Sequence, residues 1–337
     1  MRIAIDAMGG DYAPEAVVQG TLDAAGVIEA ELALVGDLAK IEACLPKRDR
    51  PESLEIHHAS QVVEMDDSPV VAVRQKKDSS LVVAAQMVKS GQADALVTVG
   101  NTGAAGAVSR LMWGAIPNID RPAIATVIPT YRGSTVLIDS GASVDCSAKH
   151  LLDFALMGQI YASQVIGIEN PRVALLNIGE EETKGNTLTK EAFTLMKSYM
   201  GDDFYGNVEG KHLFEGLVDV VVCDGFVGNV LLKSGEGVAE MMMRLLKEEL
   251  TAHPLMKAPL ALLRPAFKRF RARLDWREYG GAPLLGVKGV CIIGHGRSDA
   301  YAVRQAIMVA AQAVAGQLVP TIHQSVQLLH QTEAKRA

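Results

Sequence analysis

The chain of 337 residues is poor in aromatic side chains, which make up 5%, and contains only four cysteines. The cysteines stand far apart at positions 44, 146, 223 and 291, so no C-x-x-C pair indicates a redox centre or a zinc site. This spread is typical of reduced thiols in a cytosolic protein. No uncharged hydrophobic stretch reaches the ~18 residues of a membrane-spanning helix.

The start of the chain lacks the long apolar core of a secretory signal. Residues Met1–Asp6 read as a short strand that meets an acid at its end. We therefore expect a cytoplasmic protein, one that can still contact a membrane peripherally.

Basic residues are also fewer than acidic residues. Lysine and arginine number 33 against 39 acids, which gives a net charge of −6. Proteins that coat nucleic acid are usually basic, so we expect no nucleic-acid partner. One segment is an exception, because residues 257–277 hold seven bases and a single acid.

Short apolar strands alternate with helices along most of the chain. We expect strands at these places: Arg2–Asp6, Leu32–Val35, Leu54–Ala59, Ala95–Val99, Ala123–Ile128, Thr135–Ile138, Val173–Ile178, Val218–Cys223 and Gly289–Ile293. This order predicts an α/β fold, a mainly parallel sheet sandwiched by helices in a Rossmann-like single domain over residues 1–337. Ligands in such folds bind beyond the carboxyl ends of the strands. Since glycine-rich loops follow several strands, we expect these loops to converge on one cleft.

A helical hairpin is predicted to protrude from this domain over residues 236–277. Its first arm, Glu236–Thr251, carries several methionines and leucines, and three prolines at 254, 259 and 265 prevent one continuous helix. The apolar segment 255–263 forms the expected tip, and the basic residues follow it. Three interpretations stay open: a dimer interface, docking of an acidic protein, and contact with a membrane.

Several glycine loops are candidates for binding phosphate. Gly100-Asn101-Thr102-Gly103 follows a strand and precedes a helix, where backbone N–H groups can hold an anion. Gly9-Gly10-Asp11 and Asp224–Asn229 have the same placement. The alternative is structural, with Asn101, Asp11 or Asp224 capping a turn or a helix. No G-x-G-x-x-G or G-x-x-x-x-G-K-[ST] motif is present, so the loops do not indicate a dinucleotide or nucleotide-triphosphate site.

Few side chains look catalytic. Lys184 precedes Gly185-Asn186 and can meet an oxyanion as a point charge, and Lys233 lies one helical turn after Asn229. His295 stands between two glycines and is an acid–base candidate, with a structural hydrogen bond as the alternative. No G-x-S-x-G and no recognisable reactive cysteine is present. The pattern favours a site that holds an anion and lets the substrate attack.

At these residues the chain resembles a known family, the bacterial phosphate acyltransferases of phospholipid synthesis, which are acyl-(acyl carrier protein):phosphate transacylases. The resemblance covers nearly the whole chain in these blocks: Ile5–Asp11, Met65–Pro69, Gly100–Ala104, Arg121–Ile124, Leu175–Glu181, Lys184–Asn186, Cys223–Asn229, Tyr279–Gly286 and Ile293–Gly296. One departure is Ser143, at a position where the family commonly has asparagine.

The resemblance implies a reversible reaction in which inorganic phosphate takes a long-chain acyl group from acyl carrier protein. The acyl phosphate then serves a membrane acyltransferase that acylates glycerol 3-phosphate. The resemblance also implies a fold like that of phosphotransacetylases and isocitrate dehydrogenases, a homodimer, and no organic cofactor. We expect no metal. The rival functions are a short-chain phosphotransacetylase acting on acyl-CoA and a non-catalytic acyl-binding or membrane scaffold protein.

These considerations assign the candidate residues. The catalytic candidates are Lys184, His295, Asp224 and Asn229. The candidates for binding phosphate or substrate are Gly9, Gly10, Asp11, Asn101, Thr102, Gly103, Asn186, Gly225 and Gly228. The candidates for membrane or partner contact are Leu260, Leu262, Leu263, Lys268, Arg269, Arg271 and Arg273.

Overall fold

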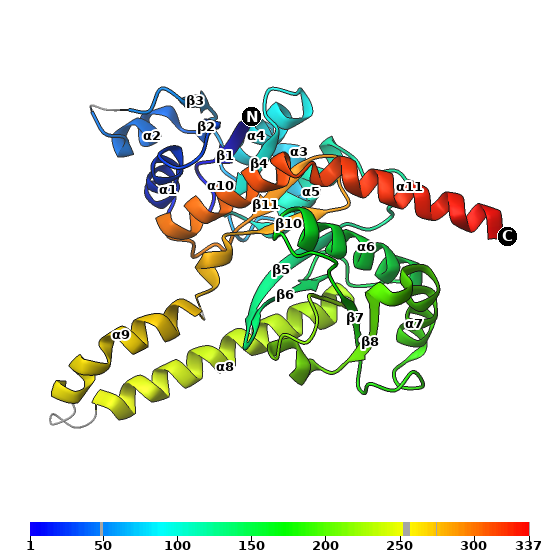
Figure 1. Cartoon of the computed structure of the whole chain (residues 1–337). Coiled ribbons are helices and arrows are strands. Elements are labelled where there is room, and N and C mark those ends of the chain that lie inside the picture. The colour runs from blue at the N-terminus through cyan, green and yellow to red at the C-terminus, as the bar shows by residue number, and fades with distance from the viewer. Residues whose placement is uncertain (48–49, 252–256, 274, 337) are drawn as a thin grey trace.

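Figure 1 shows the computed structural model of the chain. The structure describes residues 1–47, 50–251, 257–273 and 275–336, without the side chains of residues 257–262, 264, 271, 276, 330 and 332–336. The strands are β1 Arg2–Asp6, β2 Glu31–Gly36, β3 Leu54–His58, β4 Ala95–Thr98, β5 Ala123–Thr130, β6 Gly133–Ile138, β7 Val173–Leu176, β8 Phe204–Val208, β9 Val220–Val222, β10 Ala282–Leu285 and β11 Val290–Ile293. The α-helices are α1 Glu15–Ala25, α2 Leu38–Cys44, α3 Pro69–Gln75, α4 Ser80–Lys89, α5 Thr102–Met112, α6 Ala148–Gln164, α7 Thr187–Met200, α8 Gly225–Thr251, α9 Lys257–Arg273, α10 Ala300–Ala315 and α11 Leu318–Arg336.

The strands form one 11-stranded sheet in the order β3-β2-β1-β4-β11-β10-β5-β6-β9-β7-β8. Pairing is parallel from β3 to β11 and again from β6 to β8. The three pairings between β11 and β6 are antiparallel. The expected mainly parallel α/β sheet is confirmed, but three reversals make its two parallel blocks run in opposite directions.

The sheet separates hydrophobic cores on its two faces. In β1, Ile3 and Ile5 face one core while Ala4 faces the other, as the two-residue repeat of a strand dictates. The first core extends over both blocks and takes in the buried faces of α1, α6, α7, α10 and α11. On the opposite face, α3, α4 and α5 cover the first block. The start of α8 covers the second block there, through Leu231 and Leu232.

Two helices, α8 and α9, leave the body in the same direction (Figure 1). The hairpin expected over residues 236–277 falls on these two helices, and α8 begins earlier, at Gly225. Pro265 lies inside α9 and does not end it. Along α8, Met241, Met242 and Leu245 are more than half exposed. The hairpin therefore presents apolar side chains that the described part of the chain does not cover.

Most strand predictions are confirmed to within a few residues, but β8 and β10 were not expected. The helix α10 is capped by Asp299, which accepts the N–H of Ala302 at 3.0 Å. Within the described ranges no single helix is long and apolar enough to cross a membrane, although the bent pair α10 and α11 passes that test by length and composition.

Candidate active site

Three glycine loops meet at the carboxyl end of the first parallel block. They follow β1, β4 and β11, and we call residues 9–11, 99–103 and 294–297 the first loop cluster. The N–H of Asp11 donates to the carbonyl of Gly296 at 2.8 Å. A Cβ on Gly9 would lie 2.9 Å from the backbone N of Gly100, and Gly10 has φ +98°. Only glycine lets these backbones approach so closely.

Asn101 uses its side chain to build this cluster. Its amide nitrogen donates to the carbonyls of Glu64, Met65 and Asp67 at 3.1 to 3.2 Å. Its amide oxygen accepts the N–H of Ala104 at 2.9 Å, so Asn101 also caps α5. The structural alternative raised for this residue is therefore present, and its side-chain donors are occupied by the acidic loop 64–67.

The first turn of α5 leaves backbone donors at the cluster. Thr102 and Gly103 are exposed, and their N–H groups have no acceptor among the described residues. Such groups carry the positive end of the helix dipole and bind anions. The strongest backbone candidates for phosphate are therefore Thr102 and Gly103.

A buried carboxyl, Asp6, lies beneath these loops. It accepts the hydroxyl of Thr98 at 2.8 Å and the N–H of Met8 at 3.3 Å. Burial raises the pKa of Asp6, and its hydrogen bonds oppose that shift. Because the side chain is only 3% exposed, Asp6 shapes the loops and does not present its charge to solvent.

A second loop cluster, residues 139–143 and 223–229, lies at the carboxyl ends of β6 and β9. Buried Asp139 accepts the N–H groups of Ile124, Gly141, Ala142 and Ser143 at 2.6 to 3.0 Å. Burial raises its pKa, and these four donors oppose the rise. Asp139 thus fixes the loop against which α8 begins.

The glycines at the start of α8 are required by this contact. A Cβ on Gly228 would lie 1.9 Å from the carbonyl oxygen of Asp139, and one on Gly225 would lie 2.6 Å from its carboxylate. The carboxylate of Asp224 accepts the N–H groups of Phe226 and Val227 at 3.0 and 2.9 Å. Asp224 is therefore the cap of α8, which is the structural alternative for this residue.

Two further side chains complete the second loop cluster. A Cβ on Gly141 would lie 2.9 Å from the amide nitrogen of Asn229, which is exposed. Ser143, the departure from the family pattern, donates its hydroxyl to the carbonyl of Pro122 at 2.8 Å. The serine side chain, which is shorter than the asparagine common in the family, thus uses its hydroxyl in a hydrogen bond to the backbone.

The two clusters are connected along one face of α8. Asn229, Lys233, Glu236 and Glu240 recur every three or four residues, so they share a face, which we call the α8 polar stripe. The stripe is about 16 Å long, from the 1.5 Å rise per residue. At its far end the carboxylate of Glu240 lies 3.6 Å from the guanidinium of Arg297.

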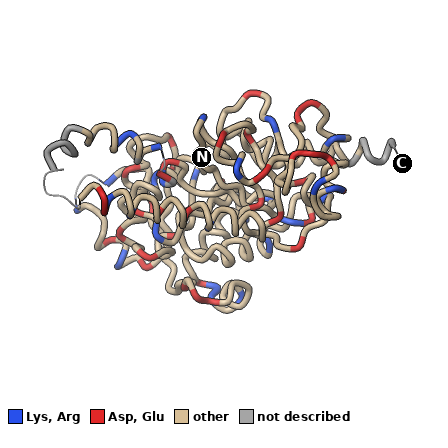
Figure 2. The backbone as a smooth tube through the Cα atoms, turned by 90° about the horizontal axis from the view of Figure 1, so that it is seen from below, with Lys and Arg blue, Asp and Glu red and all other residues tan. Residues whose placement is uncertain are grey.

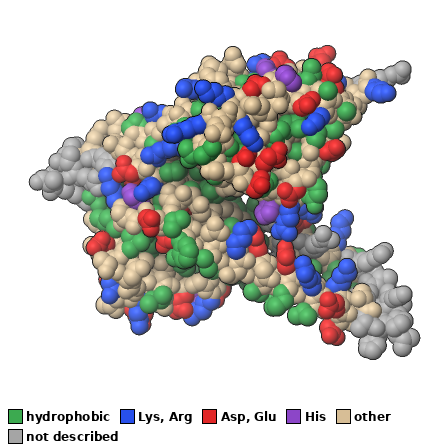
Figure 3. All heavy atoms as spheres, turned by 180° about the vertical axis from the view of Figure 1, so that it is seen from behind, with side chains coloured by type: hydrophobic (Ala, Val, Ile, Leu, Met, Phe, Trp, Pro, Cys, Tyr) green, Lys and Arg blue, Asp and Glu red, His purple; other side chains and the backbone are tan. Residues whose placement is uncertain are grey.

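The expectation that all glycine loops converge on one cleft stays a prediction. The two blocks of the sheet run in opposite directions, so their carboxyl ends do not share an edge. The loops form two clusters, and α8 links them. Figure 3 shows charged side chains of both signs around the hollow at the base of the hairpin.

His295 lies at the meeting point of the first loop cluster and the stripe. Its Nδ1 accepts the N–H of Arg297 at 3.1 Å, so in the neutral ring the proton is on Nε2. Partial burial lowers the pKa of His295, and the charges of Lys233 and Arg297 lower it further, whereas Glu236 and Asp11 oppose them. A neutral imidazole that donates from Nε2 is the favoured form.

Lys184 and Asn186 belong to a third loop, which follows β7. Asn186 accepts the N–H of Thr189 at 2.9 Å and caps α7. Lys184 is exposed, and its ammonium has no ion-pair partner within the described part of the chain. The structure shows no contact between Lys184 and His295, so a role of the Lys184 ammonium in the reaction stays a prediction.

The thiols do not resemble nucleophiles. Burial raises the pKa of Cys146 to about 11 and that of Cys291 to about 12. Burial also raises the pKa of Cys223, and the nearby charges of Asp224 and Asp139 add to the rise. Among the described residues, no three His, Cys, Asp or Glu side chains are grouped as a metal would require.

The hairpin candidates are only partly described. The side chains of Leu260, Leu262 and Arg271 lie outside the described residues. Leu263 is 49% exposed, and Lys268 and Arg269 are exposed. Arg273 donates to the carbonyl of Tyr131 at 2.9 Å and so joins α9 to the turn between β5 and β6.

Three residues of the site escaped the sequence reasoning. Asp139 precedes Ser143 by four residues, and Arg297 directly follows the block that ends at Gly296. No local pattern shows that Asp139 is buried and accepts four N–H groups, or that Arg297 reaches α8. Glu240 belongs to a helix that we interpreted only by its methionines. A polar spacing of 4, 3 and 4 residues from Asn229 onward was the available signal.

The comparisons with known proteins of similar sequence agree on the family that this chain matches. Residues 1–320 match the model of a family described as fatty acid synthesis protein. A phosphate acyltransferase of Pelotomaculum thermopropionicum is 51% identical over 327 residues, 97% of this chain and 95% of that protein. Another, of Thermodesulfovibrio yellowstonii, is 47% identical over 336 residues, 99% of this chain and 96% of that protein.

Solved structures of similar fold have much lower sequence identity. A phosphotransacetylase from Streptococcus pyogenes superposes with a TM-score of 0.63 at 15% identity and covers 94% of both chains. A branched-chain phosphotransacylase from Enterococcus faecalis gives 0.54 at 14% identity, over 93% of this chain and 99% of that one. At such identities the likeness shows the fold alone.

Proposed function

The chain belongs to the family of fatty acid synthesis proteins whose curated relatives are named phosphate acyltransferases, and from this premise we propose its substrates. It is an acyltransferase of fatty acid and phospholipid synthesis. The proposed donor is a long-chain acyl carrier protein, and the proposed acceptor is inorganic phosphate. The product is an acyl phosphate for glycerol 3-phosphate acylation.

The observation that carries this proposal is the pair of unused donors at the start of α5. The N–H groups of Thr102 and Gly103 have no acceptor within the described residues, and the first loop cluster surrounds them. Phosphate is a dianion, so it suits a helix N-terminus with two free donors. Asp6 and Asn101 hold this cradle in place and need not touch the substrate.

The chemistry requires no covalent enzyme intermediate. Hydrogen phosphate attacks the thioester carbon, the new C–O bond forms, and the C–S bond breaks. The proton of the phosphate goes to the departing thiolate, so an acyl phosphate and a free thiol result. The protein has to align the phosphate and stabilise the oxyanion of the tetrahedral intermediate.

We assign the stabilising charges to the stripe and to His295. The Nε2–H of His295 donates to the phosphate or the oxyanion. Lys233 supplies the positive charge on α8, where it lies 3.1 Å from Glu236. Asn229 offers an amide at the other end. Lys184 is kept as a second candidate cation, from the third loop.

We propose that the hairpin binds a second copy of the chain, the acyl carrier protein or a membrane. The exposed apolar face of α8 fits a homodimer interface, since Val238, Met241 and Leu245 are each more than half exposed. The bases of α9 fit the acidic carrier protein or an anionic membrane, where the downstream acyltransferase is. Elsewhere charges of both signs are distributed over the body (Figure 2).

The test is acyl phosphate formation. Purified protein is mixed with palmitoyl carrier protein, with and without inorganic phosphate, and the product is trapped with hydroxylamine. Phosphate-dependent palmitoyl hydroxamate is the expected result. Product from acetyl-CoA alone would replace the proposal with a short-chain phosphotransacetylase. No product from either donor, with folded protein, would favour an acyl-binding protein.

A further inference from the structure

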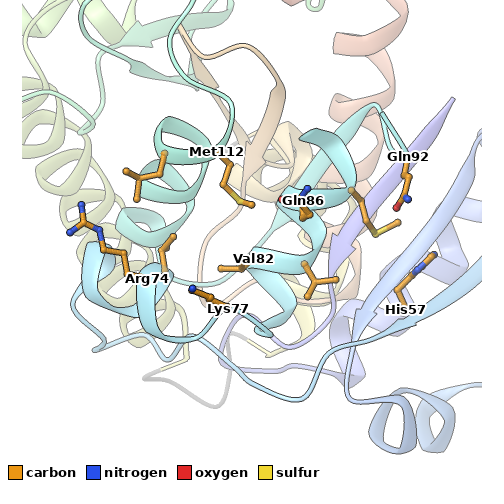
Figure 4. A pocket seen from close by; sticks show the side chains of 11 residues that line it. His57, Arg74, Lys77, Val82, Gln86, Gln92 and Met112 are labelled. Atoms are coloured by element: carbon orange, nitrogen blue, oxygen red, sulfur yellow. The ribbon is translucent and has the colours of Figure 1, made fainter. Parts of the chain in front are cut away.

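A cavity of about 590 Å³ lies over α4, between α3 and α5 (Figure 4). Its volume is in the range of small-molecule sites, roughly 300–1,000 Å³. The apolar lining residues are Val73, Val82, Val83, Met87, Leu111 and Met112. Leu111 is 50% exposed, so the cavity opens to solvent through an apolar mouth. The established part of the function does not account for it.

The polar groups of this cavity are unevenly distributed. Figure 4 shows Arg74 and Lys77 at one end, next to α3, and His57 and Gln92 at the other, with Val82 between them. No carboxylate is among the residues that line it. Neither Arg74 nor Lys77 forms an ion pair within the described residues, so the α3 end is cationic.

Two helices connect the cavity to the first loop cluster. The helix α5 begins at Thr102, beside the phosphate candidates, and reaches the cavity at its last residue, Met112, about 15 Å away at 1.5 Å per residue. The helix α3 begins at Pro69, and a Cβ on Gly103 would lie 2.6 Å from the Pro69 ring. Arg74 is therefore on a helix that begins at the first loop cluster, and Lys77 follows the end of that helix.

We propose that this cavity binds a long-chain acyl anion, with the anionic end at Arg74 and Lys77 and the chain across α4 toward Gln92. An apolar trough with one cationic end and no carboxylate matches an amphiphile of that chemistry. The identity of the occupant rests on the proposed function, which makes a long-chain acyl phosphate at the neighbouring loops. The same chemistry would admit a free fatty acid.

Binding is measured without turnover, by fluorescence of a pyrene-labelled hexadecanoic acid added to the full chain. Val83→Trp places an indole in the trough at a half-buried position, and Val27→Trp, after α1 and 54% exposed, is the matched control. We expect Val83→Trp to weaken binding at least ~10-fold and Val27→Trp to leave it unchanged. Circular dichroism checks that each variant is folded, and Leu111→Asp is the second variant should Val83→Trp not fold.

Competition by unlabelled ligands tests the charged end. Hexadecyl phosphate and palmitate should displace the probe, and the double variant R74E/K77E should weaken both, at least ~10-fold, while neutral hexadecanol is unaffected. Tighter displacement by hexadecyl phosphate than by palmitate assigns the site to amphiphiles with a phosphate head, the class of the product, and equal displacement assigns it to long-chain anions in general.

Two results would overturn the assignment of this cavity as a binding site. One is equal probe affinity in wild type, Val83→Trp and R74E/K77E. The other is a dimer that becomes a monomer in Leu111→Asp with probe binding intact, since the trough would then belong to a second copy. Neither outcome touches the hydroxamate assay, so this site and the acyl-transfer proposal can fail separately.

Discussion

The guanidinium of Arg297 lies 3.6 Å from the carboxylate of Glu240 and joins the loop after β11 to the middle of α8. Both side chains are more than half exposed, so the pair adds little to the stability of the fold. Its position beside His295 gives it a different consequence, because Arg297 is one of the charges that lower the pKa of that ring.

Removing the charge of Arg297 should move the pH dependence of activity. In the proposed mechanism the neutral ring of His295 is the active form, so activity should fall as pH drops through its pKa. In Arg297→Gln that pKa rises toward the ordinary value, and the acidic limb of the kcat/KM profile moves to higher pH. The control is Glu240→Gln, which breaks the same ion pair and leaves the charge of Arg297 in place. Equal shifts in both variants, or none in either, would contradict the assignment.

Lys233 should act on phosphate. Lys233→Met removes the cation of the stripe, and we expect KM for phosphate to rise at least ~10-fold while KM for the acyl carrier protein stays unchanged. Lys247→Met, on an exposed position farther along α8, is the matched control. An unchanged phosphate KM in Lys233→Met would place the phosphate away from α8.

The contact between α8 and Asp139 should be intolerant of a single methyl group. Gly228→Ala puts a Cβ 1.9 Å from the Asp139 carbonyl oxygen, so we expect a loss of at least about 2 kcal/mol in unfolding free energy. Gly237→Ala, in the same helix with nothing within 4 Å, should be neutral or stabilise by about 0.5–1 kcal/mol. Urea unfolding of both variants measures the difference. Similar midpoints would show that the start of α8 adjusts easily.

The sequence predicted the strands and most helices because their patterns are local. Short, continuous apolar runs define β1 and β4. Asp37 caps α2 by accepting two backbone N–H groups. The reversals at β10 and β5 depend on long-range pairing, which no local pattern encodes. The division of the loops into two clusters joined by α8 was therefore not predicted.

For the candidate residues, too, local patterns were informative and long-range contacts were not predicted. Motifs identified the loops correctly as places where backbones meet, but they did not say which side chains face solvent. Asn101, Asp224 and Asn186 each cap a helix, whereas Thr102 and Gly103 keep free donors. The cap and the anion site share one sequence signature, because both exploit the unpaired N–H groups of a helix start.

The apolar tip of the hairpin should decide membrane binding. Replacing Leu260, Leu262 and Leu263 with serine should abolish flotation of the protein with anionic phospholipid vesicles, because it removes the side chains that would enter the lipid. Replacing Met241, Met242 and Leu245 with serine changes the other arm and should weaken the proposed dimer while flotation persists. Flotation of the triple leucine variant at the wild-type level would assign the tip to a protein partner.

Lys184 provides the sharpest remaining test, because its charge lies on a loop that the structure does not connect to His295. Lys184→Ala should lower turnover at least ~10²-fold if its ammonium meets the oxyanion, as the loss of one stabilising donor does in acyl transfer. Lys190→Ala, six residues away in α7, is the control for a general effect of lost charge. If both variants turn over at the wild-type rate, the transition-state charge belongs to the first loop cluster and α8 alone. If Lys184→Ala is slow and His295→Ala is equally slow, the third loop takes part in the reaction together with the first loop cluster.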